Sequence, residues 1–334
     1  MSAAEDESAE RDALRARYVA FAENEARGVS PLYERLARAV AASEPLLRFV
    51  SSLPPAKRQP NLLFAAVRYL YGTPDDGPHL ADLVARHPDP IRALMLARGT
   101  QTNEPGRCAV LLPALAGLPQ PLALLEVGAS AGLCLLPDWY GYRYGSRQVA
   151  PRHTALYPGP VFPCEANAAT PIPRVVPEIV WRAGLDLNPI DLADPEEVAW
   201  LETLVWPGNS GREQRLRATM RIAREHPPRL TRGDLLADLP ALAAQAPRDA
   251  TLVIFHSAVL AYVTPEIRAR FAETVRALNA VWISNEASSV LPEVAARLAV
   301  PPPAGRFLLA IDGEPVALTA PHGQAIEWLH RRES

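Results

Sequence analysis

The spacing of apolar residues divides the chain into a helical first part and a second part in which strands alternate with helices. In the first part, apolar side chains recur at helical spacing, as at Leu14, Tyr18 and Phe21. No alternating strand pattern interrupts this periodicity. The pattern predicts a helical N-terminal domain over residues 11–118, after an acidic tail at residues 1–10 that we expect to be disordered.

Short apolar runs characterise the second part of the chain. The strand candidates are Leu122–Leu125, Ile179–Leu187, Thr251–Val259, Val281–Ser284, Phe307–Ile311 and Pro315–Thr319. Such runs, alternating with helices, are typical of a mostly parallel sheet buried on both faces, and Asp312-Gly313 between the last two predicts a hairpin turn. We therefore predict an α/β fold over residues 119–334, with helices on both faces of the sheet, an antiparallel edge hairpin, and an insertion of loops and short strands at residues 145–178.

The composition limits the possible functions. Hydrophobic residues make up 49% of the chain and charged residues 21%, as in ordinary globular proteins. The net charge of −3 provides no broad basic surface, so we expect no nucleic-acid partner. The sequence has no apolar run long enough to span a membrane and no signal-peptide core, which favours a cytoplasmic protein. The three cysteines lack metal-ligand spacing, so we expect free thiols and no metal site.

The most informative stretch follows the first strand candidate and reads Glu126-Val-Gly-Ala-Ser-Ala-Gly132. Small residues let a ligand approach the backbone closely, and a helix starting after the turn would offer free N–H groups. The spacing does not match the dinucleotide fingerprint Gly-x-Gly-x-x-Gly. It does match the Gly-x-Ser-x-Gly elbow of α/β-hydrolases, with Ser130 as the nucleophile. A tight turn without any ligand is a further interpretation.

Several motifs of the second part resemble those of the Rossmann-like S-adenosylmethionine-dependent methyltransferase superfamily. Glu126 stands two residues before Gly128, as in the first motif of that superfamily, although Ser130 replaces a usual glycine. Gly184-Leu-Asp-Leu-Asn-Pro189 resembles its acid-ended second strand, and Gly233-Asp234 resembles the dipeptide that meets adenine. The resemblance implies a Rossmann-like sheet, S-adenosylmethionine as cofactor and S-adenosylhomocysteine as its product.

The resemblance also implies roles for individual residues. Backbone amides of Gly128, Ser130 and Gly132 would meet the methionine carboxylate, Asp186 the ribose hydroxyls, and Asp234 the adenine. The full set expected to bind the cofactor is Glu126, Gly128, Ala129, Ser130, Gly132, Asp186, Asn188, Asp234, Leu235, His256 and Ser257.

A base helps methyl transfer to a hydroxyl or an amine. His256 is the first candidate, because an imidazole ordinarily titrates near neutral pH, and Glu286 is the second. Tyr262 is a candidate for lining the acceptor site. Structural roles for His256 and Tyr262, as a strand-end polar residue and a packing aromatic, are the alternatives.

A polar loop precedes the central turn by one predicted helix. It is expected either to cap that helix or to cover the ligand, and side chains on the substrate side would include Trp139 and Arg215. Core packing and a solvated basic helix face are the alternatives for these last two residues. The loop residues that would face the ligand are Gln101, Asn103, Glu104 and Arg107.

The sequence thus predicts an S-adenosylmethionine-binding protein that methylates a small-molecule acceptor. Two alternatives remain: an esterase with Ser130 as nucleophile and Asp312 and His322 as its partners, and a scaffold that binds the cofactor without methylating anything. The whole chain also resembles a bacterial family of uncharacterised proteins, in Gln101-Thr-Asn-Glu104 and in the central turn. That second resemblance implies no activity.

Overall fold

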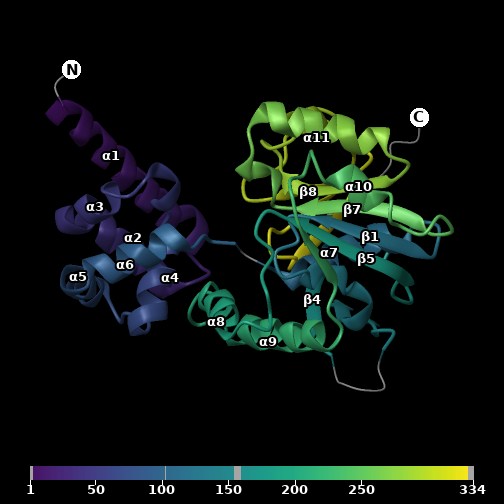
Figure 1. Ribbon diagram of the computed structural model, residues 1–334, viewed down its shortest axis with the longest axis horizontal. Coiled ribbons are helices and arrows are strands. Elements are labelled where there is room, and N and C mark those ends of the chain that lie inside the picture. Colours follow the sequence, from purple (N-terminus) through teal and green to yellow (C-terminus); the bar gives the residue numbers. More distant parts are fainter. Residues whose placement is uncertain (1–2, 102, 154–158, 330–334) are drawn as a thin grey trace. The chain divides into compact units, whose positions relative to one another are not determined.

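The computed structural model describes residues 3–101, 103–153 and 159–329 (Figure 1). Within them the protein is a mixed α/β structure with a helical N-terminal region and an open, mostly parallel sheet. The predicted fold class is confirmed at this level. No helix in the described part is both long and apolar enough to cross a membrane.

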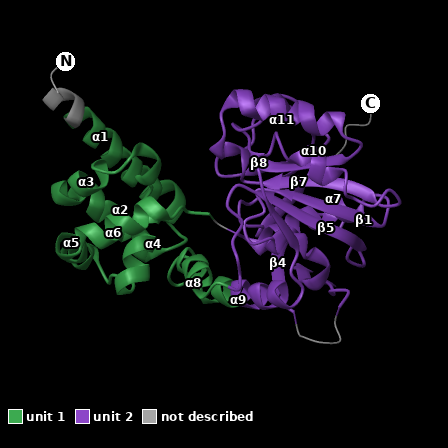
Figure 2. Ribbon diagram, in the orientation of Figure 1, with its two compact units in different colours: residues 1–102, 194–214 green, residues 103–193, 215–334 purple. Residues whose placement is uncertain are grey.

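The chain divides into two compact units (Figure 2). The helical unit comprises residues 1–102 and 194–214, and the sheet unit comprises residues 103–193 and 215–334. The helices of the first unit are α1 (Ala3–Phe21), η1 (Ala22–Ala26), α2 (Pro31–Ala42), α3 (Glu44–Ser51), η2 (Pro55–Lys57), α4 (Pro60–Tyr71), α5 (Gly77–Arg86), α6 (Pro88–Ala97) and α8 (Pro195–Thr203).

Local signals explain where several of these helices begin. The Ser30 hydroxyl accepts a hydrogen bond from the Tyr33 amide at the start of α2, and the Asp76 carboxylate accepts one from His79 at the start of α5. Helix α1 begins at Ala3, inside the predicted disordered tail, because alanine and glutamate favour helices and acidic residues suit a helix N-terminus. Residues 1–2 of that tail lie outside the described residues.

The helical unit also contains residues 194–214, which the predicted domain boundary places in the second domain. Trp200 on α8 is buried in the core of this unit, and its indole donates a hydrogen bond to the Gly99 carbonyl at 3.0 Å. Arg68 on α4 bonds the carbonyl of Val205 and the carboxylate of Glu213. Sequence order could not reveal this, because the contacts join residues more than a hundred positions apart.

The sheet unit contains eleven described strands. They are β1 (Leu122–Val127), β2 (Gly141–Tyr144), β3 (Arg147–Val149), β4 (Val161–Ala166), β5 (Ile179–Asp186), β6 (Arg229–Arg232), β7 (Thr251–Ser257), β8 (Val281–Ala287), β9 (Phe307–Ile311), β10 (Glu314–Thr319) and β11 (Ala325–Trp328). Its helical segments are η3 (Pro105–Arg107), α7 (Cys108–Ala116), η4 (Leu133–Leu135), η5 (Pro137–Trp139), most of α9 (Ser210–Glu225), α10 (Leu239–Ala243), η6 (Leu260–Tyr262), α11 (Pro265–Ala277) and α12 (Pro292–Ala295).

The strand order is β3-β2-β4-β11-β10-β9-β8-β7-β1-β5-β6. From β6 to β8 all neighbours are parallel, and β9 and β10 follow antiparallel. The chain leaves β1 for β5 and β6 on one side and returns to β7 on the other. The β9–β10 hairpin lies inside the sheet rather than at its edge as predicted, because β11 pairs with both β10 and β4.

The two faces of the sheet carry different side chains. Leu125 and Val127 of β1 belong to a core cluster with Leu242 of α10 and Phe271 of α11. Because side chains alternate along a strand, Glu126 points to the opposite face. Helix α7 is buried nearly all round, as a helix in the core of a domain is expected to be, so it belongs with the sheet rather than with the N-terminal helices.

A close approach at Gly184 of β5 gives the first prediction. A Cβ atom there would lie 2.5 Å from the Cβ of Ala129 and 2.7 Å from Leu230. We expect Gly184→Ala to lower the free energy of unfolding by about 1–3 kcal/mol through overpacking. Urea denaturation measures this, with Gly117→Ala as the matched control, because the nearest atom there is 3.5 Å away. Equal midpoints for the two variants would contradict the prediction.

Candidate functional site

The turn after β1 is tight and partly strained. The φ angles of Gly128, Ser130 and Gly132 are 72°, 53° and 70°, in the left-handed region that glycine tolerates and serine rarely adopts. A Cβ at Gly128 would lie 2.4 Å from the Val259 side chain, so only glycine lets the turn after β7 pack this closely. Ala258, in that second turn, is also left-handed, with φ 58°. The turn after β1 therefore contacts the turn after β7, and the strand order reverses between these two strands.

The protein itself uses the amide groups of the first turn. Gly128 donates to the Leu185 carbonyl at 2.8 Å, Ser130 to Asp186 Oδ2 at 2.8 Å, and Gly132 to the Ala129 carbonyl at 2.7 Å. The expected arrangement, in which these amides face a ligand carboxylate, is thus not present. Asp186 also accepts the Asn188 amide at 2.8 Å, so its carboxylate fixes the turn against β5.

No α-helix follows the turn, contrary to expectation. The short 3-10 segments η4 and η5 come next, and the chain then enters β2. Pro137 starts the second of these segments, and proline inside a helix would remove a hydrogen bond and clash with the preceding turn. A helix macrodipole therefore does not contribute to ligand binding here.

Buried oxygen atoms without hydrogen-bond partners collect at this end of the sheet. In the described part, six buried side-chain nitrogen or oxygen atoms have no partner, and the four that lie in the sheet unit belong to Asn103, Glu126, Ser130 and Glu286. Asn103 Nδ2 donates to the Ala129 carbonyl at 2.8 Å, which ties this residue to the turn as well. Unpartnered buried polar atoms are costly, so their concentration at one edge indicates a place for a polar ligand or ordered water.

The polar loop before α7 does reach the central turn. Arg107 is buried, and its Nη1 donates to the Ser257 carbonyl and its Nε to the Pro321 carbonyl, each at 2.9 Å. Cys134 Sγ lies 3.4 Å from the Glu104 carbonyl oxygen. Gln101 belongs to the helical unit, and residue 102 lies outside the described residues.

Glu126 occupies an unusual electrostatic environment. Its side chain is only 5% exposed, and burial raises the pKa of this carboxyl well above its ordinary value. Cys134 and Asp186 act in the same direction, whereas the Arg107 guanidinium lowers this pKa. A buried acid with an unpartnered oxygen and a nearby cation is a suitable group for binding a positively charged or hydrogen-donating ligand.

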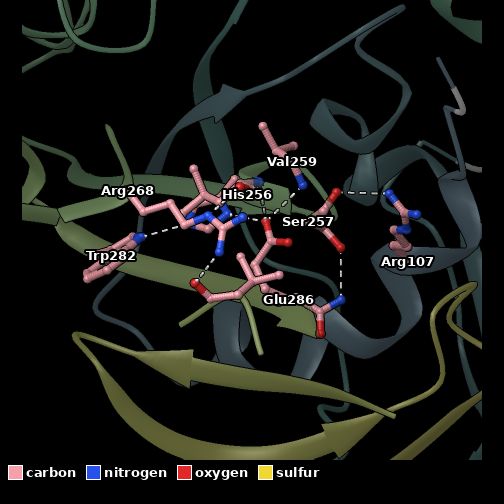
Figure 3. A network of polar contacts seen from close by, with 10 residues as sticks. Arg107, His256, Ser257, Val259, Arg268, Trp282 and Glu286 are labelled. Carbon is pink, nitrogen blue, oxygen red and sulfur yellow. Dashed lines mark hydrogen bonds and ion pairs between the residues drawn. The ribbon is translucent and has the colours of Figure 1, made fainter. Parts of the chain in front are cut away.

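His256 and Glu286 form a buried pair (Figure 3), on the face of the sheet opposite to Glu126. His256 Nδ1 lies 2.7 Å from Glu286 Oε1, and the Trp282 indole N–H donates to His256 Nε2 at 3.0 Å. Because Nε2 accepts this bond, the ring proton must lie on Nδ1. Both ring nitrogens are therefore engaged, so the imidazole has no nitrogen left for a substrate proton in this arrangement.

The remaining candidate residues are dispersed. Asp234 caps its own turn, accepting the Leu236 amide at 2.8 Å, and Leu235 packs against the sheet core. Tyr262 is 73% exposed on η6. Trp139 stacks between two histidines, and Arg215 lies over the Phe162 ring. Contacts of these residues with a ligand stay predictions.

The esterase interpretation finds no triad here. Ser130 Oγ has no hydrogen-bond partner in the described part. Asp312 bonds the Trp282 amide at the amino end of β8, whereas Ser130 follows the carboxyl end of β1, and β1, β7 and β8 are parallel. His322 lies beyond β10 near Glu104, so β10 separates it from Asp312. The three residues do not converge.

Two features of this edge had no direct signal in the sequence. Ala258 gives no hint of a left-handed conformation, since alanine rarely adopts one. The pairing of His256 with Glu286 depends on the register between β7 and β8, which joins residues thirty positions apart. Leu187, which is 61% exposed directly after Asp186, could have been noticed as an apolar residue at a strand end.

Fold and site together define a mixed α/β protein with a polar, partly unsatisfied edge where its strand order reverses. The chain belongs to a family described as uncharacterized protein conserved in bacteria (DUF2332), whose model matches residues 15–328. No curated protein and no solved structure matches the chain. Among the described residues, no three or more His, Cys, Asp or Glu side chains are grouped to hold a metal ion.

The raised pKa of Glu126 gives the second prediction. The Glu126 carboxyl keeps its proton to a higher pH in the folded protein than in the unfolded chain. The contribution of Glu126 to the free energy of unfolding therefore falls as the pH rises above 4.5, the ordinary pKa of a glutamate. We expect Glu126→Gln to be more stable than the parent protein at about pH 8, with the difference shrinking as the pH is lowered toward that ordinary value.

Urea unfolding at a series of pH values measures this difference. Glu273→Gln, on an exposed position of α11, is the matched control and should show no such trend. A Glu126→Gln effect that does not change with pH would contradict the assigned environment.

Proposed function

We propose that the protein binds S-adenosylmethionine at the carboxyl edge of β1 and β7 and transfers its methyl group to a small-molecule acceptor. One observation carries the proposal: every buried unpartnered side-chain oxygen described in the sheet unit lies at this edge. The bound cofactor would supply an electrophilic methyl group on a sulfonium.

The strand order supports the location. The parallel segment β6-β5-β1-β7-β8 has the order 3-2-1-4-5 when these strands are counted along the chain, as in doubly wound Rossmann-like sheets. In such sheets, ligands bind outside the carboxyl ends of the strands where the order reverses. That place lies between β1 and β7, where the two strained turns touch.

The residues present fit the polar groups of this cofactor. Glu126 Oε2 is an acceptor suited to the α-ammonium group, and Arg107 Nη2, which donates no bond in the described part, suits the carboxylate. Asp186 offers acceptors for the ribose hydroxyls, since each carboxylate oxygen has more than one lone pair. The exposed Leu187 beside Asp186 offers an apolar surface for the adenine ring of the cofactor.

In this proposal Arg107 replaces the turn amides as the partner of the ligand carboxylate. The amides are engaged within the protein, as are the capping oxygen of Asp234 and the ring of His256. Alignment of the acceptor with the methyl group would supply most of the rate enhancement, because the transfer needs little acid–base chemistry. A scaffold that binds the cofactor without turnover is the alternative, and release of S-adenosylhomocysteine across an acceptor panel separates the two.

Titration calorimetry with S-adenosylmethionine and S-adenosylhomocysteine tests the binding directly. We expect Glu126→Gln and Asp186→Asn each to weaken binding roughly tenfold or more, because each replaces an acid that would bind the ligand with a neutral amide. Glu273→Gln should bind like the parent protein. Absence of binding by the parent protein would refute the proposed function.

Ser130→Gly separates cofactor binding from the esterase alternative. Glycine suits the φ of 53° at this position, so we expect the variant to be at least as stable and to retain cofactor binding. An esterase using Ser130 would lose all hydrolysis of p-nitrophenyl acetate in the same variant. Ester hydrolysis that depends on Ser130, with no cofactor binding, would favour the esterase.

A further inference from the structure

A second buried acid at the same edge has an unused oxygen. Glu286 lies near the carboxyl end of β8, and its side chain is 2% exposed. Its Oε1 accepts the Val259 amide at 2.9 Å and the Leu260 amide at 3.1 Å, in addition to the His256 contact. Its Oε2 has no hydrogen-bond partner in the described part.

The two oxygens therefore have different roles. Oε1 and its three N–H donors hold the turn after β7 in place, and the Trp282 indole fixes the His256 tautomer that points a proton at Oε1 (Figure 3). None of these contacts needs Oε2. The structural role of Glu286 therefore rests on Oε1 alone, and a glutamine carbonyl oxygen could accept the same bonds more weakly.

The surroundings of Glu286 Oε2 indicate that a ligand group donates a hydrogen bond to this oxygen. Burying a carboxylate oxygen without a partner costs free energy, and a hydrogen-bond donor placed against it offsets that cost. The adjoining turn is strained at Ala258, and strain of this kind is concentrated at functional positions. Val259 of that turn is the residue that packs on Gly128, so Glu286 adjoins the proposed cofactor site.

We propose that Glu286 Oε2 accepts a hydrogen bond from a hydroxyl or amine group of the acceptor molecule, with His256 and Trp282 as positioning residues. This inference rests on the proposed function for the identity of the ligand as an acceptor. It assigns the acceptor to the alcohols and amines, because a carboxylate oxygen binds hydrogen donors and repels anions.

Nuclear magnetic resonance of the full chain labelled with ¹⁵N-tryptophan tests the subsite without any turnover. The indole N–H of Trp282 reports on the chain of contacts through His256 to Glu286, and the Trp282→Phe variant assigns its signal. The probes are methylammonium and methanol, with tetramethylammonium as a cation that lacks N–H donors. Each is titrated with and without S-adenosylhomocysteine.

We expect methylammonium, methanol or both to shift the Trp282 signal in a saturable way, and tetramethylammonium to have no such effect. The apparent affinity should fall roughly tenfold or more in Glu286→Gln and stay unchanged in Glu273→Gln. The probe that saturates the shift of the Trp282 signal at the lower concentration shows whether the subsite prefers an amine or an alcohol.

Three results would overturn the inference: no saturable shift with either donor, an equal shift with tetramethylammonium, or unchanged affinity in Glu286→Gln. The comparison of donors in the parent protein decides the matter even if the variant does not fold. Failure of the proposed function is a separate result, because S-adenosylhomocysteine would then not bind while the donors still bind at Glu286.

Discussion

The candidate site depends on the contact between Gly128 and Val259. The missing side chain at position 128 lets the turn after β7 pack directly on the turn after β1. With Val259 in this place, its amide and that of Leu260 both reach Glu286, and Ala258 takes up a left-handed conformation. A side chain at position 128 would separate the turns and break this arrangement, which explains why the glycine is required even without a ligand.

Buried charge is the second constraint at this edge. The Arg107 guanidinium lowers the pKa of Glu126, and it also donates hydrogen bonds to the carbonyl groups of Ser257 and Pro321. A buried guanidinium that donates to two carbonyls joins three distant segments of the chain, and removing it would break both hydrogen bonds. The same residue therefore organises the loops around the site and reduces the cost of burying the Glu126 carboxylate.

Much of the fold follows from local patterns, whereas the site depends on contacts between distant residues. The buried strand Thr251–Ser257 and the capped helix α11 could be predicted because apolar runs and capping residues act locally. The absence of a helix after Gly132 could not, although Pro137 was a signal that a helix there would be short. The pairing of His256 with Glu286, and the use of the turn amides by Leu185 and Asp186, depend on strand register.

The register also places the two carboxyl groups that have an unpartnered oxygen on opposite faces of the sheet. Glu126 pairs with Phe255, so His256, one residue further along β7, points to the other face. His256 and Trp282 both contact Phe271 of α11, and Glu286 bonds His256 on that side. A single small polar group cannot satisfy both carboxylates, because the edge of β7 lies between them. In the proposed function, the cofactor and the acceptor would each supply one of the two polar groups, one on each face of the sheet.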